Sequence, residues 1–447
     1  MLASLAVGEA AAHVGTLQEA SRASDVPQWY VVTVAGVVVG VSFLFTSMMA
    51  DHAALRWLNG LSLRARLPAG ARTLLSWLLG AASVLALAGV IGIGLFGPPV
   101  ANRNLASLGI WVAWWGGFTI FTYTVGNAWP AIDPFRRLAA LVPAGPRWDY
   151  PDRLGAWPAV VGLLVLVFAE VVSGSTERPR VLALLVLGYA VVTVAGAVAV
   201  GTRTWFDNAD PLAAVFRTYG SLAPVQRTAD GLSLRLPGAA LTDGQVFRKP
   251  GRVAFVVALL WATTFDGLVS TPQWRAVLDP LTGVGVPAVL AYVAALAGGF
   301  LVFYGVYRWT ARACRRAADT YVTETAIERW LAPSLVPIAA GYHLAHFLGY
   351  VLSLSPALTA ALADPLATSG GAAGFPVAVL PGWFGFLQLG FVLLGHFLAV
   401  WVAHSIAFEL FPGARQPIRS QYPLIGVMIA YTLVSAWVVV SPTVPTP

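Results

Sequence analysis

The stretch SLVPIAAGYHLAHFLGYVLSL, residues 334–354, decides the class of fold. It contains no Asp, Glu, Lys or Arg, and its length matches the roughly 20 mostly apolar residues that an α-helix needs to cross a bilayer. We therefore predict a membrane-spanning helix here. Nine further segments have the same character: 29–50, 74–96, 106–124, 156–173, 181–200, 253–270, 288–307, 383–407 and 424–440.

The composition of the whole chain agrees with this interpretation. The chain has 447 residues, of which 58% are hydrophobic and only 11% are charged, and its mean hydropathy is +0.74. Soluble domains carry roughly 25% charged residues, so this chain cannot cover its surface in water. The sequence predicts an all-α, polytopic integral membrane protein whose main partner is the lipid bilayer.

The basic residues alternate along the chain. Of the 27 Lys and Arg residues, 22 lie in every second connecting segment and 5 lie in the others. Because basic loops stay on the inner side of a cell membrane, we expect the Arg-rich segments inside and both termini outside. The net charge of +7 is thus a topology signal, and we expect no nucleic-acid partner.

The connecting segments suggest some additional structure. Residues 1–28 form an outer N-terminal segment, and 29–447 form one transmembrane domain with a large inner loop at 201–252. Within that loop, residues 210–220 have helical apolar spacing and predict an interfacial helix, whereas 233–249 predict a small hairpin. A second interfacial helix is expected in 313–333.

Ionisable residues inside the spans are costly unless they have partners, so they mark a candidate site. His343 and His346 are three residues apart and share a helix face, and His396 lies at a similar depth in the next span. Asp266 and Glu170 lie at comparable depths, each roughly 20 Å from the inner end of its span.

One interpretation of these residues is a metal site. His343, His346 and His396 would bind a divalent metal such as zinc, and Asp266 or Glu170 would act as the catalytic base for a metal-activated water. A site of this kind requires the three imidazoles to converge. The same residues also fit hydrogen-bonded helix packing, a bis-histidine haem, or a proton or ion relay.

Short stretches along most of the chain resemble one family. They are DVPQWYVV at 25–32, NAWPAIDPFR at 127–136, TFDGL at 264–268 and SLVPIAAGYHLAHF at 334–347. These stretches are similar to polytopic membrane proteins of GC-rich bacteria and haloarchaea named fenitrothion hydrolases. The resemblance implies a membrane hydrolase whose small-molecule substrates are organophosphorus esters.

Two other functions remain open from the sequence. A ten-span secondary transporter could consist of five-plus-five inverted repeats, in which spans one and six correspond and Gly267 interrupts span six beside Asp266. A non-catalytic membrane subunit is the other.

Overall fold

The computed structural model describes residues 28–441, except 67, 143–145, 174, 176, 230, 244–246, 367–374 and 414. The predicted N-terminal segment 1–28 lies, apart from Gln28, outside the described residues. Within them, nine helical stretches are long and apolar enough to cross a membrane. They are Trp29–Ser47, Thr73–Phe96, Leu105–Thr124, Pro179–Val200, Arg252–Val269, Ala288–Ala318, Glu324–Ala363, Phe384–Leu410 and Arg415–Val440.

These stretches confirm the all-α, polytopic fold. Their main helices are α1 (Gln28–Ser47), α3 (Ala69–Phe96), α9 (Pro179–Val200), α12 (Arg252–Val269), α14 (Ala288–Ala318), α16 (Leu335–Ala363), α17 (Phe384–Leu410) and α18 (Arg415–Val440). The remaining predicted span, 156–173, is the fourth along the chain and corresponds to α8 (Trp157–Ser173), an apolar helix of 17 residues. At 1.5 Å per residue α8 is about 26 Å long, slightly less than the hydrocarbon thickness of a bilayer.

The third span is not a uniform α-helix. It consists of α4 (Leu105–Leu108), a π-helical stretch η2 (Gly109–Phe118) and α5 (Thr119–Thr124). Hydropathy located the span but is blind to its hydrogen-bond pattern. This span therefore differs from its α-helical neighbours. π-Helical turns are rare and often lie at functional sites.

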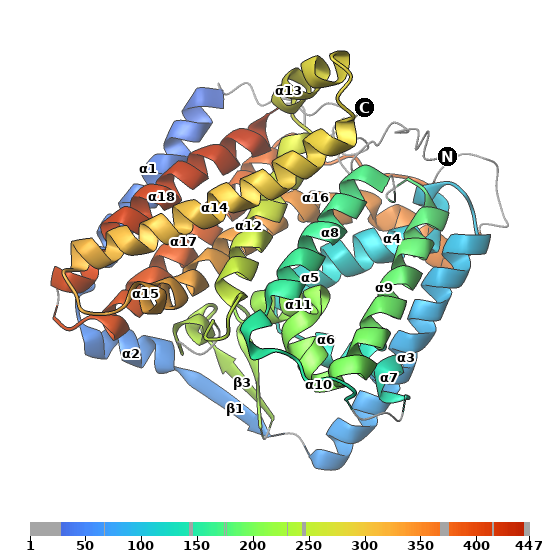
Figure 1. Ribbon diagram of the computed structural model, residues 1–447, viewed down its shortest axis with the longest axis horizontal. Coiled ribbons are helices and arrows are strands. Elements are labelled where there is room, and N and C mark those ends of the chain that lie inside the picture. Colours follow the sequence, from blue (N-terminus) through green and yellow to red (C-terminus); the bar gives the residue numbers. More distant parts are fainter. Residues whose placement is uncertain are drawn as a thin grey trace.

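The packing of the spans matches the symmetry of two repeats only in part, because the α3–α9 contact has a counterpart between α14 and α18. α1 packs along α17 and α18, as Figure 1 shows, and α3 packs on α9. An inverted repeat would require α12 to pack on both α8 and α9 in the way that α1 packs on α17 and α18. Within the described residues α12 packs extensively on α8 but not on α9.

Hydrogen bonds join the five segments that the basic residues predict on one side of the membrane. The bonds run from His52 Nδ1 to Phe408 O, from Gln416 Nε2 to Ala318 O, from Arg235 Nη2 to Asn59 O and from Val225 N to Val125 O. We call this end of the bundle the arginine-rich side. The short helix α13 (Pro272–Gly283) lies at the other end, as Figure 1 shows. The alternation of basic residues therefore predicted correctly which loops share a side.

A small antiparallel sheet lies on the arginine-rich side. Its strands β1 (Ser62–Arg66), β2 (Val225–Thr228) and β3 (Gly231–Arg235) are arranged in the order β1-β3-β2. A hairpin is thus present, but it begins earlier than the prediction of 233–249. The residues after Arg235 instead form the 3-10 turn η5 (Ala239–Asp243), and β3 gains a third strand from the loop after α1.

The two predicted interfacial helices also differ from the structure. The first, α11 (Pro211–Gly220), does not lie along the surface: it is buried almost completely and packs on α5 and α8. Its apolar spacing faces other helices rather than lipid headgroups. In the second region, α14 continues to Ala318, and only the short helix α15 (Glu324–Leu331) follows before α16. Another short helix, α2 (His52–Gly60), lies beside the sheet (Figure 1).

Candidate functional site

Two of the residues singled out in the sequence meet in the interior of the bundle. His346 Nε2 of α16 lies 3.3 Å from Asp266 Oδ2 of α12, and their side chains are 24% and 18% exposed. Asp266 is about 21 Å along α12 from Arg252, and His346 is about 17 Å along α16 from Leu335. Both therefore lie well inside a hydrocarbon layer about 30 Å thick.

Tyr342 completes the immediate surroundings of this pair. Its ring stacks on the His346 ring with the centroids 6.5 Å apart, and it interacts electrostatically with Asp266 and Tyr431. The Tyr342 hydroxyl occupies the space where a residue larger than Gly267 would place its Cβ. We expected Gly267 to interrupt its span, but α12 is continuous from Arg252 to Val269. The glycine instead makes room for a tyrosine hydroxyl beside Asp266.

A second set of polar groups lies next to the pair, between α12, α17 and α18. The Thr264 and Tyr431 hydroxyls are 2.7 Å apart, and the Tyr431 ring lies 6.0 Å from the His396 ring. His396 is 1% exposed, and its Nδ1 donates to Val392 O at 2.9 Å. That bond places the proton on Nδ1 and leaves Nε2 as an acceptor. No described residue hydrogen-bonds to His396 Nε2.

His343 faces a different part of the bundle. Its Nδ1 lies 3.2 Å from the Tyr123 hydroxyl of α5, and its ring contacts Trp115 of η2 and Tyr219 of α11. These contacts are on the side of α16 that faces the third span and the buried helix α11. His343 and His346 therefore contact different parts of the bundle, although they are only three residues apart.

The predicted metal-ligand set is consequently not assembled. Among the described residues, no three His, Cys, Asp or Glu side chains are grouped so that they could hold a metal ion. The physical reason is the rotation of the helices. α16 and α17 touch at Gly341 and Gly395, and His343 is offset by about 200° around α16 from Gly341, which directs it away from α17.

Glu170, the other acid proposed as a base, lies on α8 and is partly buried. It interacts electrostatically with the Tyr350 hydroxyl of α16, one turn beyond His346. The structure thus places Glu170 beside the helix that carries the histidines, but not with the Asp266–His346 pair in one metal-binding group.

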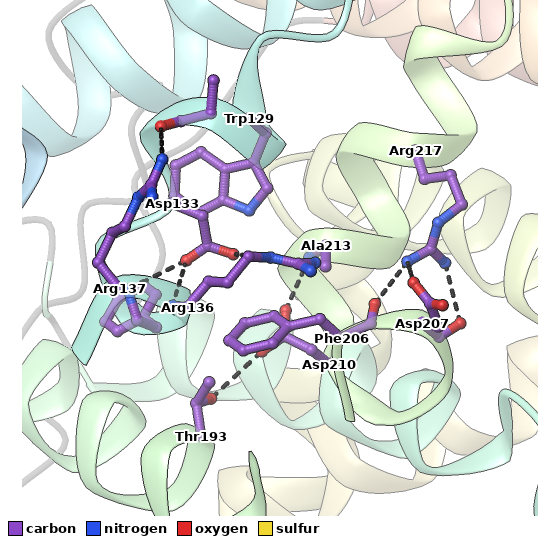
Figure 2. Close-up of polar contacts among 12 residues, drawn as sticks. Trp129, Asp133, Arg136, Arg137, Thr193, Phe206, Asp207, Asp210, Ala213 and Arg217 are labelled. Atoms are coloured by element: carbon purple, nitrogen blue, oxygen red, sulfur yellow. Dashed lines mark hydrogen bonds and ion pairs between the residues drawn. The ribbon is translucent and has the colours of Figure 1, made fainter. Parts of the chain in front are cut away.

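Sequence reasoning missed a second buried polar cluster, on the arginine-rich side. It is formed around Asp133 and Asp210, whose side chains are buried, and Figure 2 shows Arg136 extended beside them. The signal available in the sequence was the repeated Asp-Pro pair at 133–134 and 210–211, which follows the third span and then the fifth.

Comparison with known proteins does not identify a family for this chain. No family model, curated protein or solved structure matches this chain. The resemblance to the organophosphorus hydrolases thus stays an expectation from short stretches of sequence. The function has to be argued from the side chains themselves.

Proposed function

We propose that this protein is a transporter that conducts protons through the interior of the membrane, with Asp266 and His346 as the central proton-binding pair. The observation that carries the proposal is the 3.3 Å contact between Asp266 Oδ2 and His346 Nε2, which joins two different spans inside the bilayer. The metal interpretation does not enter, because its three histidines do not meet.

The energetics favour a functional role for this pair. An ionised side chain within a membrane helix costs several kcal/mol unless a partner or water compensates for it, and such residues mark ion pathways and proton relays. An Asp and a His in contact can share one proton as a neutral pair or as an ion pair. The proton can therefore move between them without leaving an isolated charge in the interior.

Neighbouring hydroxyl and imidazole groups can extend the transfer. Tyr342 lies over His346, and Tyr431 bonds to Thr264, which is two residues before Asp266 on α12. Hydroxyl groups both donate and accept hydrogen bonds, and neutral imidazole does the same through its two nitrogens. His396, with an accepting Nε2 beside Tyr431, continues this set toward α17.

Proton flux into liposomes tests the proposal. The purified chain is reconstituted with a trapped pH-sensitive dye, and flux is driven by an imposed pH gradient. Asp266→Asn and His346→Gln should each lower the flux about 100-fold, the scale on which a positioned proton carrier contributes. Asp279→Asn, which changes an exposed Asp on α13, is the matched control and should leave the flux unchanged. Flux equal to wild type in Asp266→Asn would refute the proposal.

Hydrolysis is the second candidate, and the same contact favours it. A carboxylate that orients an imidazole makes the imidazole a general base. Without a metal, His346 could take a proton from a water molecule, whose oxygen would then bond to the phosphorus of an organophosphorus ester as the phenolate leaves. The resemblance to membrane hydrolases points to that substrate class. Release of the phenol from an aryl phosphate triester by the purified protein, abolished in His346→Gln and unaffected by a chelator, would establish this function instead.

We propose further that the chain resides in the cell membrane with the arginine-rich side inside and both termini outside. The asymmetry of the basic residues supports this orientation, because the five segments that carry 22 of them lie together at one end of the bundle.

A further inference from the structure

Asp133 and Asp210 have the same local role in two different parts of the chain. Asp133 precedes Pro134 and begins α7 (Pro134–Ala140), where its Oδ1 accepts from the backbone N–H groups of Phe135 and Arg136 at 3.0 and 3.1 Å. Asp210 precedes Pro211 and begins α11, where its Oδ1 accepts from the backbone N–H of Ala213 at 2.7 Å. Each carboxyl group therefore uses one oxygen as a helix cap.

The second oxygens of the two carboxyl groups differ. Asp210 Oδ2 accepts from the Tyr189 hydroxyl at 2.7 Å and from the Thr193 hydroxyl at 3.3 Å, both on α9. Asp133 Oδ2 has no hydrogen-bond donor among the described residues, although the Asp133 side chain is 0% exposed. A buried carboxylate oxygen without a donor is costly in its ionised form.

Arg136 is the cation that serves both acids. Its Nε lies 3.8 Å from Asp133 Oδ2, too far for a hydrogen bond, and its guanidinium stacks over the Phe206 ring at 4.5 Å (Figure 2). It also interacts electrostatically with Asp210. Asp133 thus depends on one guanidinium, which makes no close contact with its Oδ2.

The other charged groups around the pair make bonds of their own, and Arg217 also interacts electrostatically with Asp210. Arg137 donates to Ser76 and Ala131 O, and Arg217 and Arg252 donate to backbone carbonyls at Phe206 and Asp207. Arg203 pairs with Asp207 at 3.9 Å, and Tyr189 faces the pair from α9 as a donor to Asp210.

From this geometry we infer that Asp133 and Asp210 form a buried proton-binding site in which one exchangeable proton resides on Asp133 Oδ2. One guanidinium balances one carboxylate, so the second carboxyl group is better accommodated with a proton. The proton adds to the oxygen that has no donor, and Oδ1 keeps its bonds to the α7 backbone. The site is distinct from Asp266 and His346 and does not depend on their function.

The electrostatics of the pair agree with this assignment. Burial, followed by repulsion from Asp210, raises the pKa of Asp133 from 3.8 to about 7. Burial also raises the pKa of Asp210, but the bonds from Ala213, Tyr189 and Thr193 oppose that increase. Asp133 is therefore the member of the pair that holds the proton, and Asp210 is the member that stays ionised.

Infrared titration of the purified protein tests the inference. Protonated carboxyl groups have a carbonyl stretching band that carboxylates lack, and the band is followed between about pH 5 and about pH 9. The wild-type protein should show one carboxyl group per chain that loses its proton with a midpoint of about 7. Asp133→Asn, which preserves a capping side chain, should remove that band, while Asp266→Asn should leave it in place.

A second variant keeps the test decisive if Asp133→Asn does not fold. Asp210→Asn removes the repulsion, so the midpoint of the Asp133 band should move to lower pH, whereas Asp51→Asn, which changes an exposed cap on α2, should not move it. A band that is unchanged in Asp133→Asn, or a midpoint that stays in place in Asp210→Asn, would overturn the inference. Neither outcome depends on proton flux, so the titration tests this inference even if the protein does not transport protons.

Discussion

Gly341 of α16 and Gly395 of α17 bring two spans into backbone contact. A Cβ on Gly341 would lie 2.8 Å from Gly395 Cα, and a Cβ on Gly395 would lie 2.9 Å from Gly341 Cα. Small residues at such crossings let membrane helices approach closely. This contact fixes the rotation of both helices, and with it the directions in which their histidines point.

Replacing either glycine by alanine should therefore destabilise the protein. We expect Gly341→Ala and Gly395→Ala each to lower the free energy of unfolding by about 1–3 kcal/mol, the usual cost of overpacking. The measurement is thermal unfolding in detergent. Gly390→Ala in the same helix α17 is the control, because nothing lies within 4 Å of its added Cβ. Equal stability of all three variants would show that the contact does not set the packing.

Gly267 gives a prediction about the geometry of the proton-binding pair. A Cβ at this position would collide with the Tyr342 hydroxyl and lie 2.6 Å from Val438 Cγ1. Gly267→Ala should displace Tyr342 from His346 and lower the proton flux by about tenfold. The collision should also lower the stability of Gly267→Ala. Adding Tyr342→Phe removes the colliding hydroxyl and should restore that stability in part. Gly298→Ala in α14, where an added Cβ meets nothing within 4 Å, should behave as wild type.

The buried acid pair predicts how stability depends on pH. The pKa of Asp133 is about 7 in the folded protein and 3.8 as its ordinary value, so the folded chain binds more protons between these values. The free energy of unfolding should then fall as pH rises from about 4 to about 7. The contribution is on the order of a few kcal/mol.

Thermal unfolding across this pH range checks that prediction. The free energy of unfolding of Asp133→Asn should depend less on pH than that of the wild-type protein. The stability of the variant relative to the wild-type protein should therefore be greater above pH 7 than at low pH. Asp51→Asn, at the exposed cap of α2, should keep the wild-type slope. A steep decline that persists unchanged in Asp133→Asn would place the responsible group elsewhere.

The orientation in the membrane is tested with reporter fusions. A reporter fused after Ala65, in β1, should be active inside the cell, and one fused after Ala363, at the end of α16, should be active outside. The two positions follow the first span and the eighth predicted span. Reporters that signal from the same side would contradict the predicted topology.

Hydropathy and basic residues were enough to predict the spans and which of the basic loops lie together. Both signals are averages over about 20 residues, and the burial of apolar surface in lipid determines them directly. The contact between Asp266 and His346 was foreseen only as part of a larger set, because depth follows from the helical rise whereas rotation does not. The rotation depends on where α16 and α17 touch, and Gly341 and Gly395 were not recognised as that point.

The buried position of α11 could not be predicted for a related reason. Its apolar spacing is the same whether the apolar face meets lipid headgroups or other helices. Only the repeated Asp-Pro pairs at 133–134 and 210–211 hinted at a polar cluster inside the arginine-rich side, and each pair alone is an ordinary helix cap.

The most direct test of the central claim is a double-mutant cycle on proton flux in liposomes. If Asp266 and His346 act as one proton-binding unit, then Asp266→Asn, His346→Gln and the double variant should retain the same small residual flux, because residues that act as a unit are not additive. All three should keep the thermal stability and the Asp133 titration of a folded chain. If either single variant transports protons at the wild-type rate, or if the two losses multiply in the double variant, the pair does not carry the proton.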